Sequence, residues 1–559
     1  MMHDAGESAI AGAGAPPPAA GGGDFLMRPA KRAGVPIWLW VVSILAFVGV
    51  VAMQRPGGSD RAEVEKLKNG EVVRSEAFSI ETMLGKMMLF LRGGGYAPET
   101  NAGAGQKPDD PVLTILEQLK DQAAASEFAQ DLFRAAVLAG EFEGPGEMKA
   151  RFAALSGRLS PGSDLHADME TATGLYEAAM SRHRAAEGTS AVGDAAVLAE
   201  SGAVMPTEAR VQSLIQRHGW VGKLAATAPE AWGHRGGPGA PAATIASGGS
   251  NAGSLVDFRK ESVGDGLALF AILGTFGVVV VVGLLSGIVL LIVGAVLVGT
   301  GTLKRWSTPW RDEFAELKPG LRGGRVWLET FTLFSLGFLA LVGLRYVIPF
   351  RRMGVDPLWF GLLSQWVLVL VLLWPVARGV PWRMTRALVG WHRGRGVARE
   401  VMFGVGAYLA SLPVYVVAVL IVVVLMMLYE MITGRKAVPP SADRLVDMAS
   451  GGLLQTIMVF LLVVVWAPVV EESIFRGNLY RLVRGKAGAL AAVVISAGAF
   501  ALMHPYLMVQ LVAIFSLGAV FALMRESRGS LIPSMTAHAL HNGTVFTLLT
   551  LLIHFGSDR

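Results

Sequence analysis

The chain has 559 residues, of which 52% are hydrophobic and 17% are charged, and its mean hydropathy is +0.48. Charged residues make up about a quarter of an ordinary soluble protein, so this composition indicates a protein that crosses the membrane several times. The 49 basic residues exceed the 44 acidic ones, but the excess lies in short loops beside apolar segments, where it reports topology. We therefore expect no nucleic-acid partner. The chain has no cysteine, which excludes disulfides, thiol catalysis and thiolate metal sites.

The first segments are predicted to be a tail and an anchor. Residues 1–35 are rich in Ala, Gly and Pro, a composition typical of a disordered N-terminal tail. The apolar run 37–53 follows a short basic cluster, as in a signal peptide or a retained anchor. We favour a transmembrane anchor at 36–54, because the leading segment is long and no clear cleavage site follows.

Charged residues return between positions 55 and 262. Apolar side chains recur there at helical spacing, as in the stretch 111–138, so this segment predicts a soluble, mostly helical domain with its own core. A stretch rich in Gly, Ser, Ala and Pro at 236–254 predicts a flexible tether at the end of the domain. The scattered histidines of the domain, His218 among them, lie among polar residues, and we interpret them as solvated surface side chains.

The rest of the chain is membrane sequence, in a first part at 263–450 and a second part at 451–555. Its apolar runs approach or exceed the roughly 20 residues that a spanning helix needs. The first run is long enough for one tilted helix or for a tight hairpin. The runs lie at 267–303, 326–350, 357–377, 401–433, 451–470, 487–503, 507–524 and 531–555.

Charge favours a single helix in the first run. With one span there, the basic loops fall on one side, which the positive-inside rule identifies as cytoplasmic. The sequence therefore predicts an all-α, polytopic membrane helical bundle of about nine spans in a bacterial-type cytoplasmic membrane. The N-terminus is then cytoplasmic, and the helical domain 55–262 is inserted on the extracytoplasmic side. Arg351 and Arg352 are exceptions, because they fall on the opposite side.

Three polar motifs interrupt the apolar C-terminal sequence, where ionisable side chains are costly to bury. They consist of Glu471, Glu472 and Arg476, then Phe500 and His504, then His538 and Asn542. Glycines and a lysine at 485–488 predict the turn of an antiparallel hairpin between the first two motifs. Residues whose numbers sum to about 975 then lie at the same height, which places Glu471 level with His504.

Helical spacing also pairs residues within the motifs. Glu472 precedes Arg476 by four residues, so an ion pair is expected between them. Glu471 points about 100° away from its neighbour and needs a different partner. Phe500 lies one turn before His504 and is predicted to form a substrate-binding wall beside the imidazole.

These residue types fit hydrolysis of a peptide bond by water, which needs a base, donors for the oxyanion and a proton for the leaving amine. Glu471 suits the base, and His504 could orient the same water. His538 and Asn542 share a helix face and could donate to the oxyanion. No cofactor is needed for this chemistry. Two alternatives stay open: hydrogen bonds that only pack the helices together, and a zinc ion held by Glu471, His504 and His538.

At these motifs the chain resembles the CPBP family of intramembrane peptidases, named for CAAX-prenyl endopeptidases and bacteriocin-processing proteins and also called the abortive-infection family. The family pattern Glu-Glu-x-x-x-Arg, Phe-x-x-x-His and His-x-x-x-Asn is matched at every fixed position, over about residues 451–550. The resemblance implies a glutamate-dependent endopeptidase in which Glu471 and His504 activate water and His538 with Asn542 stabilises the oxyanion. Older descriptions of the family as metalloproteases leave metal dependence open.

The sequence therefore predicts an intramembrane protease that acts on membrane-associated protein or peptide substrates within the lipid bilayer. The alternative is a non-catalytic scaffold or a bacteriocin-immunity-type binding protein of the same fold. A proton-coupled transporter would predict paired half-repeats, which the sequence lacks. Pro505, directly after His504, is expected to bend the helix there.

Overall fold

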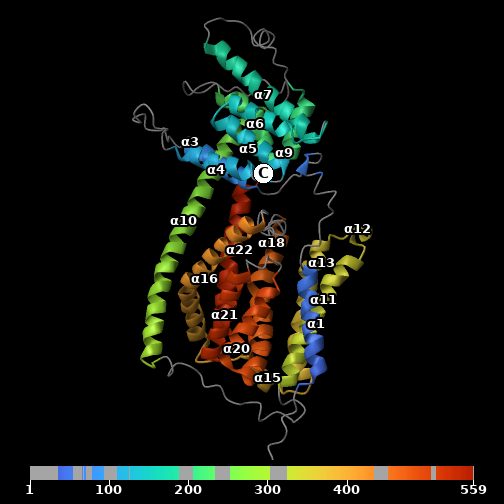
Figure 1. The fold of residues 1–559 in the computed structure, drawn as a ribbon, viewed down its shortest axis with the longest axis vertical. Coiled ribbons are helices and arrows are strands. Elements are labelled where there is room, and N and C mark those ends of the chain that lie inside the picture. The colour runs from blue at the N-terminus through green and yellow to red at the C-terminus, as the bar shows by residue number, and fades with distance from the viewer. Residues whose placement is uncertain are drawn as a thin grey trace, which may run out of the picture.

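The computed structural model shows two helical parts, a helical domain and a membrane bundle (Figure 1). Nearly all of the predicted tail, most of the predicted tether and Pro505 lie outside the residues that the structure describes. The described residues are 35–54, 66, 68–70, 79–93, 110–124, 126, 128–160, 162–187, 206–232, 252–302, 324–433, 451–504 and 511–557.

The helical domain packs around one central helix. Most residues of α5 are buried, and the aromatic side chains Phe133, Tyr176 and Trp220 fill the core around it. This burial of large apolar side chains gives the domain a core separate from that of the bundle. Its helices are α3 (Ile80–Gly93), α4 (Pro111–Ala124), α5 (Ala129–Phe142), α6 (Pro145–Ser156), α7 (Asp164–Glu187) and α9 (Glu208–Trp232).

The interpretation of His218 as a solvated side chain is wrong. The residue is fully buried, its ring stacks on Phe133 with the centroids 4.2 Å apart, and Nε2 lies 3.0 Å from Asp168 Oδ2. Burial is possible because the Asp168 carboxylate satisfies this ring nitrogen. The partner is on α7, 50 residues away, so neighbouring sequence could not reveal it.

A single long helix, α10 (Ala252–Gly299), leads from the helical domain along the bundle, so the hairpin alternative is wrong for this run. It includes the last residues of the segment predicted as a tether. Gly283 and Gly287 allow α10 to approach α16 closely, because a Cβ at Gly287 would lie only 2.4 Å from the Leu409 carbonyl oxygen. Small residues four apart are a common device for packing membrane helices.

Over the described residues, six helical segments are long and apolar enough to cross a bilayer, and the first of them is part of α10. They are Phe258–Gly299, Arg325–Arg345, Pro357–Ala377, Val397–Thr433, Leu453–Leu502 and Ile532–Gly556. The protein is thus an integral membrane protein built from helices. Ile37–Met53 is a shorter apolar helix, and Leu453–Leu502 contains two arms, so the count of about nine spans stays a prediction.

Besides α10, the bundle contains the following elements. Their bounds are α1 (Ile37–Gln54), α11 (Arg325–Val347), α12 (Phe350–Met353), α13 (Pro357–Ser364), η4 (Gln365–Leu373), α14 (Trp374–Ala377), α15 (Trp382–Val389), α16 (Val397–Thr433), α18 (Leu453–Phe460), η5 (Leu461–Trp466), α19 (Ala467–Glu471), η6 (Glu472–Leu479), α20 (Tyr480–Leu502), α21 (Leu511–Arg528) and α22 (Ile532–Gly556).

The predicted antiparallel hairpin is confirmed. Gly488 bends the chain inside α20 with a φ of 86°, a left-handed conformation that glycine adopts without strain. Beyond the bend, Ser496 Oγ donates to the Phe475 carbonyl at 3.0 Å, and the rings of Phe475 and Phe500 lie 5.5 Å apart. The two arms therefore run back along each other in nearly the predicted register.

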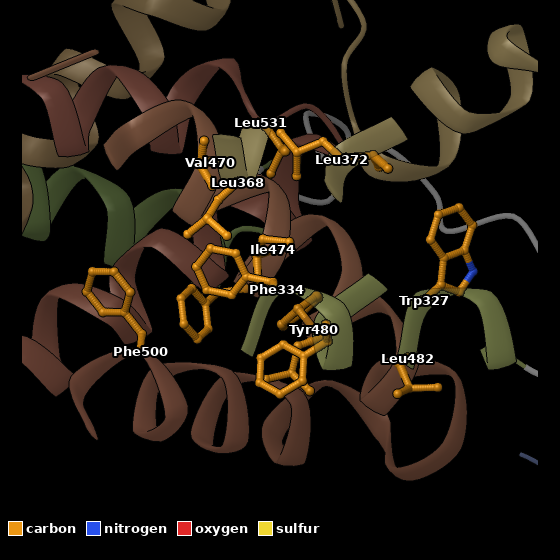
Figure 2. Close-up of a cluster of buried hydrophobic side chains, with 14 of the residues drawn as sticks. Trp327, Phe334, Leu368, Leu372, Val470, Ile474, Tyr480, Leu482, Phe500 and Leu531 are labelled. Carbon is orange, nitrogen blue, oxygen red and sulfur yellow. The ribbon is translucent and has the colours of Figure 1, made fainter. Parts of the chain in front are cut away.

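The core of the bundle surrounds this hairpin (Figure 2). Phe334 from α11 and Leu368 from η4 pack against Ile474 on the first arm, and Phe500 extends the same cluster on the second arm. This apolar packing fixes the helix face that carries the first motif.

The two ends of the bundle differ in charge. The helical domain covers one end, and α15 lies at the other (Figure 1). Arg481, at the start of α20, and Arg525, near the end of α21, both donate to the Leu388 carbonyl of α15 at 2.9 Å. The two arginines therefore lie at the level of α15. The basic segments that the structure describes near α15 therefore share one end, whereas α12, which carries Arg352, lies towards the other.

Candidate active site

Glu471 lies between two stretches of unusually wide helix. The helix is π-wound over η5 and again over η6, which begins at Glu472. Such segments are rare and are often found at functional sites, because the extra residue in the turn re-aims side chains and frees backbone groups. Here the two widened stretches lie on either side of Glu471, and the second contains Glu472 and Arg476.

A proline explains one freed backbone group. Ala467 donates to the Leu462 carbonyl, five residues earlier, so the next donor in this pattern would be the amide of Pro468. Proline has no amide hydrogen, so it cannot donate to the carbonyl of Val463. Asn542 Nδ2 of α22 donates to that oxygen instead, at 2.8 Å. Asn542 is thereby fixed against the helix that carries Glu471, and one of its two amide hydrogens is used.

Glu472 and Arg476 form the predicted ion pair, with Nη1 2.9 Å from Oε1. Both side chains have no solvent exposure. The other guanidinium nitrogen, Nη2, donates to the Gly518 carbonyl of α21 at 2.9 Å, and the guanidinium lies 4.3 Å from the centre of the Phe500 ring. The Arg476 guanidinium thus contacts a carboxylate, a carbonyl and an aromatic face and connects three helices. Arg476 Nε and Glu472 Oε2 have no hydrogen bond to a described residue.

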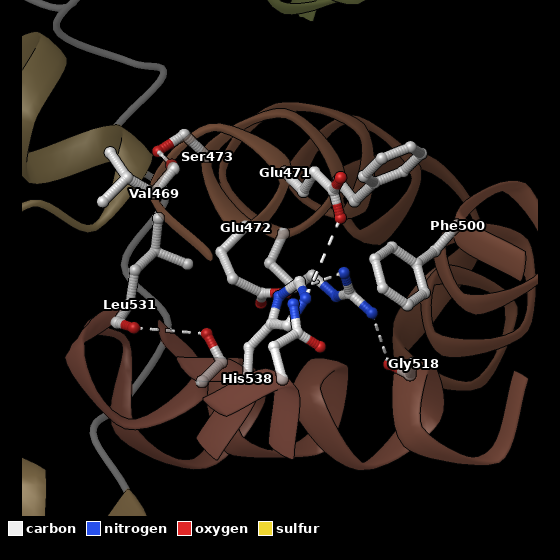
Figure 3. A network of polar contacts seen from close by, with 12 residues as sticks. Val469, Glu471, Glu472, Ser473, Phe500, Gly518, Leu531 and His538 are labelled. Carbon is white, nitrogen blue, oxygen red and sulfur yellow. Dashed lines mark hydrogen bonds and ion pairs between the residues drawn. The ribbon is translucent and has the colours of Figure 1, made fainter. Parts of the chain in front are cut away.

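His538 lies between the two glutamates (Figure 3). Its Nδ1 is 3.2 Å from Glu472 Oε1, and its Nε2 is 3.9 Å from Glu471 Oε2. The ionised Glu472 can only accept, so Nδ1 carries the hydrogen and the Nε2 of a neutral ring is an acceptor. Phe521 stacks on the ring at 5.3 Å and Phe500 meets it edge-on at 5.6 Å, which fixes its orientation.

Glu471 differs from Glu472 in having no strong partner. Its side chain is 21% exposed, and Oε2 is buried without a hydrogen bond to any described residue. The 3.9 Å to His538 Nε2 is too long for a direct hydrogen bond but short enough for one water to contact both atoms. A buried carboxylate oxygen in this condition needs a hydrogen-bond donor beyond the described side chains, such as a water.

His504 lies at the end of the second arm. Its Nδ1 is 2.9 Å from the Phe500 carbonyl, so this nitrogen donates, and its ring meets Phe500 edge-on at 5.0 Å. The Glu471 carboxylate is close enough to interact electrostatically with the ring. Phe500 thus contacts both imidazoles and the guanidinium of Arg476, as a wall common to the three motifs.

His541 points away from this group. Its ring packs edge-on against Tyr415 at 5.4 Å and against Tyr408 at 6.2 Å, both on α16. The i, i+3 spacing of His538 and His541 therefore does not bring both imidazoles to one site.

The sequence did not reveal two residues that contact the motif residues or their neighbours, Trp391 and Phe521. Ser473 Oγ donates to the Val469 carbonyl and accepts from Trp391 Nε1 at 2.8 Å, so Trp391 is bonded to the residue after Glu472. Phe521 was also missed, although its stacking orients His538. Trp391 and Phe521 lie in segments without a polar motif, and only the folded chain brings them to the site.

The zinc alternative, with Glu471, His504 and His538 as ligands, stays a hypothesis. Within the described ranges, no group of three or more His, Asp or Glu side chains could hold a metal ion. His504 and His538 each use Nδ1 in a hydrogen bond, an arrangement that metal-ligating and catalytic histidines share.

Residues 453–544 match the model of the family described as type II CAAX prenyl endopeptidase Rce1-like. The predicted resemblance to this protease family is confirmed. The match runs from the start of α18 into α22 and contains all the motif residues, whereas the helical domain and α10 lie outside it. No curated protein and no solved structure matches the chain.

The matched family implies CAAX protease-type intramembrane proteolysis for this C-terminal segment. Its motif residues come from the helices described above, in a part of the molecule built from membrane-spanning segments.

Proposed function

We propose that the protein is an intramembrane endopeptidase that hydrolyses peptide bonds of membrane-associated protein substrates with a water activated by Glu471. The observation that carries this proposal is the buried Oε2 of Glu471, which has no hydrogen bond to a described residue and lies 3.9 Å from His538 Nε2. A carboxylate with an open oxygen beside an imidazole is the arrangement that a general base requires.

In the proposed reaction, Glu471 takes one proton from the water, and the water oxygen attacks the carbonyl carbon of the substrate. The oxyanion accepts from the second amide hydrogen of Asn542 and from Nε2 of His538. The neutral ring carries its hydrogen on Nδ1, so His538 donates from Nε2 only as the doubly protonated imidazolium. Protonated Glu471 then gives its proton to the leaving amine as the C–N bond breaks. His504 orients the water, and the pair of Glu472 with Arg476 holds His538 in place.

An apolar groove supports substrate entry from the bilayer. It has a volume of about 680 Å³ and lies between α10, η5 and α22. Val464 and Gly543 line it, and they directly follow Val463 and Asn542, whose hydrogen bond joins the two helices. A groove of this size beside the motif residues can hold an apolar stretch of substrate next to the reacting bond.

The proposed orientation places the basic end near α15 in the cytoplasm and the helical domain outside the cytoplasm. In this orientation the helical domain could recruit a protein substrate, and the catalytic groups lie within the bilayer.

The test compares Glu471→Gln with Glu430→Gln, the same change on α16 outside the site, in cleavage of a reporter membrane peptide in detergent. We expect Glu471→Gln to lower the rate by at least about 100-fold, the usual contribution of a general base, and Glu430→Gln to leave it unchanged. Unfolding midpoints should match the native protein for both. Native activity should survive exhaustive chelation.

Retained cleavage by Glu471→Gln would overturn the base assignment. Loss of activity on chelation that added zinc restores would replace the proposed chemistry by the metal alternative. A native protein that binds the peptide but never cleaves it would favour the non-catalytic binding protein.

A further inference from the structure

The end of the bundle near α15 carries arginines that form no ion pair with the acidic residues that the structure describes. Arg383, Arg386, Arg393 and Arg399 are exposed, and none of them forms an ion pair with a described residue. They belong to the segment 378–399, which contains no Asp or Glu. Four like charges within so short a segment repel one another unless an anion lies between them.

The glutamates that the structure describes near this end are already bound within the bundle. Each of these glutamates accepts a hydrogen bond from an arginine of another segment. Glu400 is fully buried. The pairs are Arg378–Glu329 at 2.9 Å, Arg484–Glu526 at 2.9 Å and Arg528–Glu400 at 2.8 Å. The described glutamates are therefore neutralised by arginines within the bundle. The exposed arginines of 383–399 can pair with a negatively charged partner.

The helix that carries two of these arginines has the form of an interfacial helix. In α15, Thr385, Leu388 and Val389 are buried against the bundle, while Arg383 and Arg386 are exposed. Trp382 is 48% exposed and lies at the start of the same helix. Tryptophan favours the boundary between headgroups and acyl chains, so it places the neighbouring arginines at headgroup depth.

We propose that α15 and the segment after it, 382–399, form a binding surface for anionic phospholipid headgroups. Charge complementarity carries the assignment: the exposed arginines face outward at the membrane boundary, where the available anions are lipid phosphates. The surface lies outside the catalytic group, and the proposal does not depend on peptidase activity.

The same segment contacts both helices that carry the first and third motifs. Trp391 donates to Ser473, next to Glu472, and His392 Nε2 lies 2.9 Å from the Gly529 carbonyl, just before α22. Ser530 Oγ also donates to the His392 carbonyl at 2.8 Å. The lipid-binding surface is thus connected by hydrogen bonds of Trp391 and His392 to the helices that carry Glu472 and His538.

The experiment measures lipid binding to the full chain, purified and delipidated in detergent, by native mass spectrometry. The titrants are phosphatidylglycerol, phosphatidylcholine and inorganic phosphate. The test variant is Arg383→Gln/Arg386→Gln, and the matched control is Arg345→Gln/Arg352→Gln, which removes two exposed arginines elsewhere in the bundle. We expect the native protein to prefer phosphatidylglycerol, and the test variant to bind it about 30-fold more weakly at low salt. The control should lose less than about threefold.

Equal binding of the two lipids by the native protein would overturn the proposal. An equal loss in both double variants would also overturn it, because the effect would then be one of net charge alone. Saturable binding of inorganic phosphate that displaces phosphatidylglycerol would assign the surface to soluble phosphates instead. Unchanged unfolding midpoints of both variants in phosphatidylcholine exclude a folding defect as the cause.

Discussion

Both parts of the molecule contain a fully or almost fully buried histidine bonded to a carboxylate. In the helical domain, His218 pairs with Asp168 and stacks on Phe133. In the membrane bundle, His538 pairs with Glu472 and stacks on Phe521. The arrangements differ at the second ring nitrogen.

His218 Nδ1 is buried without a hydrogen-bond partner among the described residues, whereas His538 Nε2 faces the carboxylate of Glu471. The first pair has no second carboxylate at this nitrogen among the described residues, so we call it closed and assign it a structural role. The second leaves a carboxylate oxygen and a ring nitrogen open towards each other, where a water can bind. A buried histidine–carboxylate pair is thus no sign of catalysis by itself, and the second carboxylate makes the difference.

The largest expected effect is on the unfolding free energy, and it tests whether Glu472 has a structural role in the bundle. Glu472→Gln leaves the Arg476 guanidinium buried without its counter-charge, and breaking a buried pair in this way costs about 3–5 kcal/mol of unfolding free energy. Denaturant unfolding in detergent would measure this loss, with Glu430→Gln as the control. A variant with native stability would contradict the assigned role of Glu472.

The next effect tests how the two parts are joined. Lys86 of α3 is buried, and its Nζ binds Asp265 of α10 at 2.8 Å and the carbonyls of Phe555 and Ser557, at the end of α22, at 3.0 and 2.8 Å. Lysine also stabilises the negative end of a helix dipole. The helical domain is thereby bonded to the helix that carries His538.

Lys86→Met keeps most of the apolar stem but removes these bonds. We expect a loss of about 2 kcal/mol, since Asp265 can be hydrated, and earlier unfolding of the helical domain than of the bundle. Hydrogen exchange followed separately in α5 and α22 would show the separation. Lys149→Met, an exposed lysine of the same domain, is the control. Coincident unfolding of α5 and α22 in Lys86→Met would show that this contact does not couple the parts.

The sequence predicted much of the membrane part because its signals are local. Spacing predicted the pair of Glu472 with Arg476, and the turn before Gly488 predicted which arms pack together. What it could not predict depends on distant segments. Asp168 reaches His218 across 50 residues, and Asn542 is held by a carbonyl that Pro468 frees on another helix.

The smallest expected effect is on the pH dependence of the stability of the helical domain, which contains the pair of His218 with Asp168. Burial lowers the pKa of His218 below its ordinary value, and the hydrogen bond and charge of Asp168, which raise it, offset this only in part. In the unfolded chain the pKa returns to about 6.5. Between the lowered folded pKa and this value, the unfolded state binds a proton that the folded state does not.

Stability of the helical domain should therefore be complete above about pH 6.5 and should fall as the pH drops below it, until the folded pKa is reached. Hydrogen exchange in α5 and α9 as a function of pH would measure the decline. His218→Gln should flatten this part of the profile, whereas His166→Gln, at a half-buried histidine on α7, should leave it unchanged. If His218→Gln kept the native pH profile, the decline would come from other groups, and His218 could not serve as the closed counterpart of His538.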